Sequence, residues 1–221
     1  MIRDDLSIAC FLWGDWCELH GMDYVEKLRK GVKKHLPLPH RFICFTDKPS
    51  RSFHPDVEVI SIAGLPDWQW NLRKMYAYYW DNGLTGRVLL FDLDVIITGD
   101  LSDLANYKGG DFITCKGAYT NKAGGSLMSF PAGRWNDELW LPLVDDDGTI
   151  ENKTRGSERK YYQMAMKGQM EFWQDLFPGQ VLSYKVDCNY GVLPHGARVV
   201  RFHGQPRPHE AKAEWIGNCW A

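Results

Sequence analysis

Two aspartates interrupt an apolar stretch near the middle of the chain, Val88-Leu89-Leu90-Phe91-Asp92-Leu93-Asp94-Val95-Ile96-Ile97. The stretch is rich in β-branched and aromatic side chains and is bounded by Gly86 and Gly99, which is typical of a strand buried on both faces in a parallel sheet covered by helices. Two unpaired carboxylates inside such a core would be costly. We therefore expect Asp92 and Asp94 at the carboxyl end of the strand, where α/β sheets bind ligands.

The spacing of these two aspartates has a chemical consequence. Residues two apart in an extended chain point to the same side, so both carboxylates can bind one divalent cation or one phosphate-bearing ligand. In the alternative interpretation, one aspartate caps the following turn and the other is solvated. The hydrophobic strand before the pair favours the ligand site.

Composition limits the class of protein. With 221 residues, of which 44% are hydrophobic, the chain fits one domain with a full core, or one domain with a small appendage. Its net charge of −2 lacks the basic imbalance of a nucleic-acid binder. No apolar stretch reaches the length of a membrane span, and acidic residues near the first methionine argue against a signal peptide. The six cysteines are scattered without a C-x-x-C pair, so we expect a reduced, cytoplasmic protein.

The ten tryptophans are an unusual feature of the composition. Core packing is the common fate of a tryptophan, but a flat amphipathic ring in polar surroundings can also stack on a base or a sugar face. The tryptophans with such surroundings include Trp13, Trp68 and Trp70.

The sequence before the aspartate pair predicts the opening of an α/β sheet. We expect strands at residues 6–13, 41–47 and 57–62. Between the first two strands, apolar residues at helical spacing predict a helix that has Asp23 as its N-cap and stops before Pro37. Strands that alternate with helices in this way indicate parallel pairing through right-handed crossovers.

A second helix is expected at residues 71–80, with Arg73 and Lys74 in its first turns. Cations at this end of a helix are unfavourable for the macrodipole. These two side chains are therefore either solvated or face an anion.

The sequence after the aspartate pair predicts shorter elements. We expect helices at residues 101–107 and 156–166, and strands at 111–115, 126–130, 181–185 and 198–202. Gly124 and Gly125 precede the strand at 126–130, where they either let the backbone approach a ligand closely or form a plain turn. Residues 145–147 are three adjacent aspartates in a loop.

Together these features resemble the GT-A glycosyltransferases, most closely the family 8-like branch of retaining, metal-dependent enzymes. Asp92-Leu93-Asp94 after its apolar strand matches the D-x-D segment of that family, and Phe45-Thr46-Asp47 is similar to the end of its second strand. Residues 125–130 resemble the family's N-S-G-v-m stretch, although the asparagine and the glycine after the serine are replaced. Residues 203–208 resemble its H-F-x-G-x-x-K-P-W element, shortened by one residue, with Arg207 in place of the lysine and no tryptophan after the last proline.

The resemblance covers most of the chain and implies a fold. The expected fold is the GT-A fold, a Rossmann-like mixed α/β sheet flanked by helices. Residues 1–221 would form a single domain, with a nucleotide-binding half at about residues 1–105 and an acceptor and sugar half at about residues 106–221.

The resemblance also implies a donor site. A nucleotide-sugar, in this family usually a UDP-sugar, brings a diphosphate that Mn²⁺ or Mg²⁺ bridges to oxygen ligands. The implied metal ligands are Asp92, Asp94 and His203, and the histidine nitrogen favours Mn²⁺ over Mg²⁺. Arg207, whose fork binds phosphate bidentately, and Lys74 would stabilise the departing nucleoside diphosphate.

The resemblance also implies further contacts to the donor, for which the residue types give less chemical support. Asp47 would contact the base or the ribose, and Leu93 and Gly204 adjoin the metal ligands. Glu158, at the position that resembles the family's acidic D-Q element, is a candidate for the sugar pocket. The catalytic candidates are Asp94, Arg207 and Glu158. Front-face attack by the acceptor, the strategy often described for the family, would require no enzyme nucleophile, and the acceptor itself, a glycan, lipid, protein or small molecule, is not encoded in any motif.

Two other functions remain open at the level of sequence. A haloacid-dehalogenase-like phosphatase also has an apolar strand followed by D-x-D, which would make Asp92 and Asp94 its first motif and Asp145 and Asp146 its second acidic pair. Against this, that motif usually opens the fold, whereas here a long α/β pattern precedes it. The third possibility is a non-catalytic module that binds a nucleotide-sugar or a carbohydrate.

Overall fold

The computed structural model describes residues 6–14, 21–166 and 168–221. Its centre is a seven-stranded sheet with the strand order β3-β2-β1-β4-β7-β6-β8. Strand β7 is antiparallel to its neighbours β4 and β6, and the other neighbours pair in parallel. The expected mixed sheet is thus confirmed, and strands from both expected halves of the chain pair within it. The strands are β1 Leu6–Leu12, β2 Arg41–Thr46, β3 Val57–Ser61, β4 Arg87–Phe91, β6 Ile113–Lys116, β7 Ala123–Pro131 and β8 Glu171–Phe172.

The apolar stretch around the aspartate pair is divided between two sheets. Strand β4 ends at Phe91, the chain turns through residues 92–94, and β5 (Val95–Ile97) joins a three-stranded sheet with β10 (Val199–Arg201) and β9 (Val181–Ser183). The backbone amide of Asp92 donates to Ser126 of the large sheet at 2.9 Å, and the carbonyl of Asp94 accepts from Phe202 at 3.0 Å. The aspartates therefore lie at the carboxyl end of β4, as expected, and connect the two sheets.

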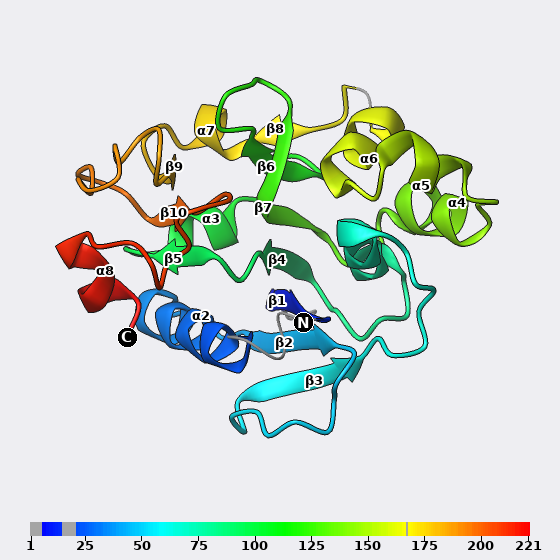
Figure 1. Cartoon of the computed structure of the whole chain (residues 1–221), viewed down its shortest axis with the longest axis horizontal. Coiled ribbons are helices and arrows are strands. Elements are labelled where there is room, and N and C mark those ends of the chain that lie inside the picture. The colour runs from blue at the N-terminus through cyan, green and yellow to red at the C-terminus, as the bar shows by residue number, and fades with distance from the viewer. Residues whose placement is uncertain (1–5, 15–20, 167) are drawn as a thin grey trace.

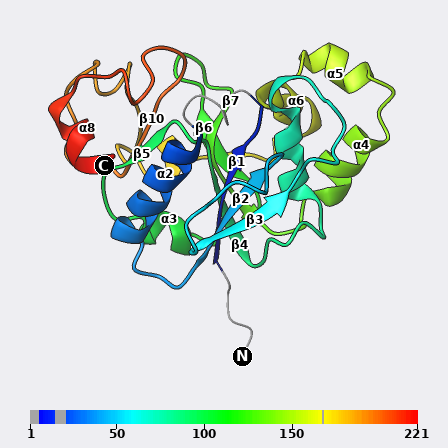
Figure 2. The same cartoon turned by 60° about the horizontal axis from the view of Figure 1, so that its bottom comes forward.

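Helices cover both faces of the large sheet, which confirms the expected layers (Figure 1, Figure 2). On one face α2 (Gly21–His35), α3 (Ser102–Asn106), α7 (Trp173–Leu176), α8 (Glu214–Cys219) and the small sheet enclose one apolar core. On the other face, the second core is enclosed by η1 (Trp70–Tyr78), η2 (Asn136–Trp140), α4 (Leu141–Val144), α5 (Thr149–Thr154) and α6 (Glu158–Ala165). In the part of the chain that the structure describes, no helix has both the length and the apolar character needed to cross a bilayer.

Strand β1 holds the two cores together because its side chains alternate between them. Ile8 and Cys10 belong to the core under α2, whereas Ala9 and Phe11 belong to the core under η1. All seven residues of β1 are buried, and full burial of a side chain such as that of Ile8 stabilises the fold by about 1.5–3 kcal/mol.

Two expected helices differ from the structure in their details. Helix α2 begins at Gly21, so Asp23 is not its N-cap; instead Asp23 forms an ion pair with Lys27 one turn later, at 2.9 Å. The segment expected as an α-helix at residues 71–80 is the 3₁₀-helix η1. Leu72, Met75 and Tyr78, at intervals of three, are all fully buried in the core on this face, and this packing suits the three-residue turn of a 3₁₀-helix.

The strand order also fixes where a ligand can bind. From β1 the chain moves outward to β2 and β3, and then returns to β4 on the opposite side of β1. Connections leave in opposite directions at such a switch point, which opens a crevice beyond the carboxyl ends of the two strands. In this fold the crevice lies beyond Leu12 and Phe91, directly before the aspartate pair.

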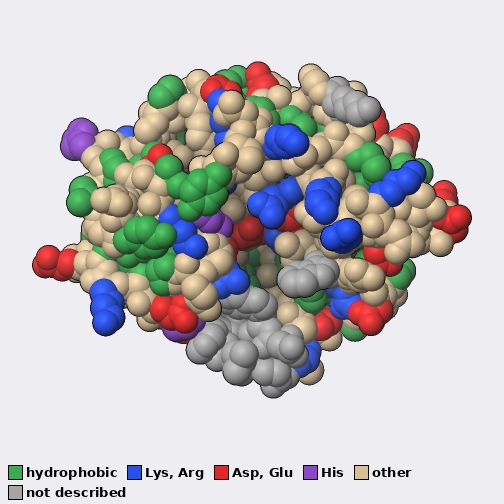
Figure 3. All heavy atoms as spheres, turned by 45° about the horizontal axis from the view of Figure 1, so that its top comes forward, with side chains coloured by type: hydrophobic (Ala, Val, Ile, Leu, Met, Phe, Trp, Pro, Cys, Tyr) green, Lys and Arg blue, Asp and Glu red, His purple; other side chains and the backbone are tan. Residues whose placement is uncertain are grey.

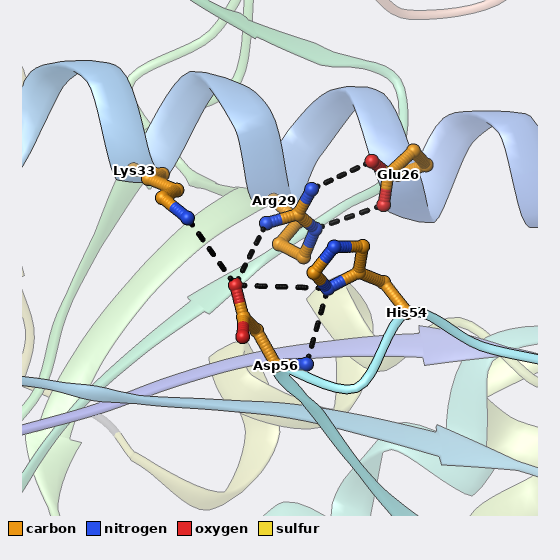
Figure 4. A network of polar contacts seen from close by, with 5 residues as sticks. All are labelled: Glu26, Arg29, Lys33, His54 and Asp56. Carbon is orange, nitrogen blue, oxygen red and sulfur yellow. Dashed lines mark hydrogen bonds and ion pairs between the residues drawn. The ribbon is translucent and has the colours of Figure 1, made fainter.

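A charged network fastens α2 to the loop before β3 (Figure 4). The guanidinium of Arg29 donates to both carboxylate oxygens of Glu26, at 2.8 and 2.6 Å, and to Asp56 at 3.2 Å. Lys33 reaches the same Asp56 oxygen at 3.4 Å, and the backbone amide of Asp56 donates to Nδ1 of His54 at 3.1 Å. The hydrogen bonds from Arg29 lower the pKa of Glu26.

Replacing Arg29 should make the free energy of unfolding depend less on pH in the acidic range. Because the pKa of Glu26 is lower in the folded state, its contribution is present above the unfolded pKa and is lost as the pH falls through the acidic range. At neutral pH we expect Arg29→Met to reduce the free energy of unfolding by about 1–2 kcal/mol, and the difference from wild type to shrink below about pH 4. Urea unfolding at several pH values measures both. Lys33→Met, which removes an exposed and longer contact to Asp56, is the control and should change little; an equal effect of the two variants would contradict the role of Arg29.

Candidate functional site

A cavity of about 240 Å³ lies at the crevice between the carboxyl ends of β1 and β4. Figure 3 shows Lys and Arg side chains gathered around a hollow on the face it presents, with acidic side chains inside the hollow. The residues that line the cavity are Phe11, Trp13, Asn71, Lys74, Phe91, Asp92, Leu93, Asp94 and Arg207. The two aspartates of the sequence motif, Lys74 of η1 and Arg207 therefore meet in one place.

Lys74 joins three separate elements at the base of this cavity. Its ammonium donates to Oδ1 of Asp92 and, at 3.1 Å, to Oε1 of Glu158 at the start of α6. Burial alone would lower the pKa of Lys74, but the charges of Asp92 and Glu158 outweigh burial and raise it, so the side chain is a cation. Both residues expected to be solvated or to face an anion face one: Lys74 faces the carboxylates at the cavity, and Arg73 pairs with the exposed Asp67.

Asp94 is held by the second cation of the cavity. Nη1 of Arg207 donates to its Oδ2 across 113 positions of sequence. Burial raises the pKa of Asp94 to about 7, the neighbouring charge of Asp92 adds to this rise, and Arg207 and Lys74 oppose it. The two carboxylates thus repel each other in a poorly hydrated place, and each is stabilised by its own cation.

Glu158 extends the site away from the aspartates. Only 3% of this residue is exposed, and burial raises its pKa to about 7 against the opposing charge of Lys74. Its Oε2 atom has no hydrogen-bond partner among the described residues. Gly124 and Gly125 lie within β7 rather than before it, and a Cβ at Gly125 would stand 2.9 Å from Oε1 of Glu158. Gly125 thus lets the backbone approach Glu158 closely, and approach to a ligand stays a prediction.

Three other expected donor-site residues, His203, Asp47 and Gly204, do not line the cavity. Nε2 of His203 hydrogen-bonds Oγ of Ser183 at 2.8 Å, and burial, together with the cations near it, lowers the pKa of this histidine. Oδ2 of Asp47 accepts from the backbone amide of Gly14 at 3.0 Å. Gly204 directly follows His203 and has a positive φ of 68°, which suits glycine.

A metal ion would find oxygen ligands here, but not a complete set. Asp92 and Asp94 offer two carboxylates in one cavity, which are the ligands that Mg²⁺ and Mn²⁺ prefer. Among the described residues, no three His, Cys, Asp or Glu side chains stand close enough together to form a metal site. The pair therefore fits the expected cation, and His203 as a third ligand stays a prediction.

Phe11 and Asn71 line the cavity although the sequence did not single them out, and Trp13, a candidate for stacking, lines it too. Phe11 stacks on Phe45 with 4.7 Å between ring centroids and meets Trp13 edge to face at 6.1 Å. The sequence could have indicated these residues by position alone, because Phe11 and Trp13 lie at the carboxyl end of the first strand, where ligands bind in such sheets. Phe11 and Trp13 thus add aromatic rings to a cavity that is otherwise lined by charged residues, Asn71, Phe91 and Leu93.

The acidic loop offers no support for a phosphatase. Asp146 accepts from the backbone amides of Ile150 at 2.8 Å and Glu151 at 3.4 Å, and so caps helix α5. Neither Asp145 nor Asp146 lines the cavity that holds Asp92 and Asp94. The second acidic pair that this alternative requires is therefore not at the site.

Removing Lys74 should destabilise the fold strongly, because the buried carboxylate of Glu158 and the half-buried carboxylate of Asp92 would lose their cation. We expect Lys74→Met to reduce the free energy of unfolding by roughly 3–5 kcal/mol. Adding Glu158→Gln should restore part of this loss, since one of the two unpaired charges disappears. Urea unfolding measures all variants, and Lys160→Met on the exposed side of α6 is the control. A double variant no more stable than Lys74→Met would show that the lysine does not act through Glu158.

Comparison with solved structures identifies the fold. The chain is similar to the glycosyltransferase GlyE of Streptococcus pneumoniae TIGR4, with a TM-score of 0.69 and 12% identity over 97% of this chain and 60% of that one. It is also similar to the galactosyltransferase LgtC in complex with donor and acceptor sugar analogs, with a TM-score of 0.67 and 12% identity over 96% of this chain and 93% of that one. The chain thus spans about three fifths of the length of GlyE and nearly all of LgtC.

The likeness rests on structure alone. No protein-family model matches the sequence, and a search of curated proteins finds no match either. At 12% identity the neighbours establish the architecture and not the activity. The mixed sheet, the helices on both of its faces and these neighbours together show that the chain has the GT-A glycosyltransferase fold.

Proposed function

We propose that this protein is a cytoplasmic glycosyltransferase that moves a sugar from a UDP-sugar to an acceptor with the aid of Mn²⁺ or Mg²⁺. The observation that carries the proposal is the cavity at the switch point of a GT-A fold, where two carboxylates and two cations meet. The five cysteines in the described part of the chain are all free thiols, which supports the reduced compartment.

The charges of the cavity suit a metal-bound diphosphate. Asp92 and Asp94 would hold the cation, with His203 as the further ligand that the sequence predicts. Lys74 and Arg207, which now neutralise the two aspartates, would then be available to the phosphate oxygens. When the metal and the diphosphate bind, the aspartates would exchange their cationic side chains for the metal, and the two cationic side chains would exchange the aspartates for phosphate. No buried charge is then left without a partner of opposite sign, which would be costly.

The same groups suit the chemical step. Departure of the nucleoside diphosphate builds negative charge on its oxygens, and fixed cations stabilise that charge in the transition state. Arg207 can do so with two parallel hydrogen bonds, because its guanidinium fork matches a phosphate. The bound cation supplies Lewis-acid stabilisation of the same oxygens.

The remaining residues would orient the donor. The rings of Phe11 and Trp13 offer faces on which a uracil or a ribose can stack. Asp47, at the end of the neighbouring strand β2, would contact the nucleoside. Glu158 has a buried oxygen without a partner, which a sugar hydroxyl can satisfy. Retention of configuration, by front-face attack of the acceptor, completes the proposal.

Binding of UDP should depend on both the metal and the aspartate pair. We expect UDP to bind in the presence of Mn²⁺, and EDTA or Asp92→Asn to weaken binding by at least about tenfold, because the metal loses a charged ligand. Isothermal titration calorimetry measures this, with Asp145→Asn in the exposed acidic loop as the control variant. Metal-independent binding, or binding that Asp92→Asn leaves intact, would contradict the donor site.

Turnover distinguishes an enzyme from a binding module. With Mn²⁺ present, at least one member of a panel of UDP-sugars should be hydrolysed slowly to UDP, and Arg207→Met should lower that rate by about 10²-fold or more, since it removes a cation from the departing phosphates. Arg207→Lys keeps the charge and should retain more activity, while Lys160→Met should equal wild type. Tight UDP binding without release of UDP from any donor would instead indicate a non-catalytic nucleotide-sugar-binding protein.

A further inference from the structure

We call the cavity that Asp92, Asp94, Lys74 and Arg207 line the donor cavity, after its proposed ligand. A second cavity, of about 310 Å³, shares no lining residue with it. It lies between the loop that joins β6 to β7, helix α7, the segment after β9 and the end of β10. We call it the Arg201 cavity. The residues that line it are Lys116, Gly117, Ala118, Tyr119, Thr120, Asn121, Gln174, Val186, Asp187 and Arg201.

Arg201 is the unusual residue of this cavity. It is the last residue of β10 and is 95% buried, with a relative exposure of 5%. Its buried Nε atom has no hydrogen-bond partner, and none of the ion pairs among the described residues involves Arg201. A buried cation without a partner is costly, so a buried arginine is normally paired. Arg201 therefore has an unmet requirement for an anion, and it faces a cavity.

The other charges of the cavity do not meet that requirement. Asp187 lines the cavity, but its Oδ2 atom accepts from the backbone amide of Ser183 at 2.7 Å and it forms no ion pair with Arg201. Asp175 pairs with Lys116 at the rim. Lys185 adds a further positive charge beside Gly204, since a Cβ at that glycine would stand 3.6 Å from its ammonium. The side chains in and beside the cavity thus carry an excess of positive charge, to which the buried Arg201 contributes.

The rest of the lining is suited to a sugar. Tyr119 is 75% exposed, and an exposed aromatic ring offers a face to the apolar side of a pyranose. Thr120 and Asn121 follow it on the same loop and supply a hydroxyl and an amide. The ring of Tyr119 also meets His203 edge to face, with 5.7 Å between centroids. This contact connects the Arg201 cavity to the segment that carries Arg207 into the donor cavity.

We propose that the Arg201 cavity binds the anionic group of an acidic acceptor sugar, either the carboxylate of a uronic acid or a phosphate ester, with Arg201 as its partner. The role as acceptor rests on the proposed glycosyl transfer, whereas the binding of an anion rests on the cavity itself. Both anions present paired oxygens that match the guanidinium fork. An acceptor is favoured over the donor because the donor diphosphate already has Lys74 and Arg207 in a separate cavity.

The experiment titrates glucuronate, glucose 6-phosphate and neutral glucose into the full chain by calorimetry, with and without saturating UDP and Mn²⁺. We expect at least one of the two anionic sugars to bind about tenfold or more tightly than glucose, and its affinity to survive saturation with UDP. Arg201→Met should abolish this preference, because the charged fork is lost. Asp187→Asn should tighten binding, because it removes the acidic group from the lining. The relative affinities of the two anionic sugars distinguish the carboxylate from the phosphate.

The control variant is Arg198→Met, which removes an arginine just before the same strand. Nε of Arg198 also lacks a hydrogen-bond partner, but this side chain packs against Gly99, outside the Arg201 cavity. It should leave anion binding unchanged. Arg201→Met should fold, with a melting temperature equal to or above that of wild type, since an apolar side chain of similar length replaces an unpaired buried charge.

Three results would overturn the proposal: anionic sugars that bind no better than glucose, Arg201→Met with wild-type preference, or displacement of the anionic sugar by UDP. The proposed transferase function is tested separately by the dependence of UDP binding on Asp92. Absence of UDP binding with intact Arg201-dependent binding of an anionic sugar would reject the donor site and retain the anion site. The converse would reject the anion site alone.

Discussion

The buried ammonium of Lys74 is the interaction on which the site and its surroundings depend. It lies between the carboxylates of Asp92 and Glu158, so it connects the 3₁₀-helix η1, the end of β4 and the start of α6. None of these groups would be stable as a buried charge by itself. The polar floor of the cavity that Asp92 and Asp94 line and the packing of the helices on that face are therefore one arrangement, and the charged groups of the cavity also hold the fold together.

Local rules predicted one part of this arrangement and missed another. The position of Asp92 and Asp94 followed from the cost of a charge in a buried strand, a rule that needs only neighbouring residues. The pairing of Lys74 with Glu158 joins positions 84 residues apart, and sequence spacing could not reveal it. The sequence limited Lys74 to a solvated position or one that faces an anion, and Glu158 to the sugar pocket by resemblance. The packing of α6 against η1 and β7 brings them together. The same holds for Phe11, whose role depends on which strand lies next to its own.

The secondary structure shows a similar division. Six strands of the large sheet were predicted because apolar runs bounded by glycine and proline determine them locally, whereas the two-residue strand β8 was not predicted. Segment 88–97 was more difficult, since the strand β5 after the aspartates pairs with β10, about a hundred residues later. For η1, an interval of three between Leu72, Met75 and Tyr78 was present in the sequence, but intervals of three also occur in α-helices. The tertiary packing of those three side chains decides between the two.

The aspartate pair has one further property, which follows from the backbone on either side of it. The amide of Asp92 is hydrogen-bonded to β7 of the large sheet, whereas the carbonyl of Asp94 is bonded to Phe202, directly after β10 of the small sheet. Each carboxylate is thus attached to a different sheet, with a single residue between them. A small rotation of one sheet against the other would therefore change the spacing of the two carboxylates. Residues 92–94 thus couple the relative orientation of the two sheets to the arrangement of carboxylates that the cavity offers to a ligand.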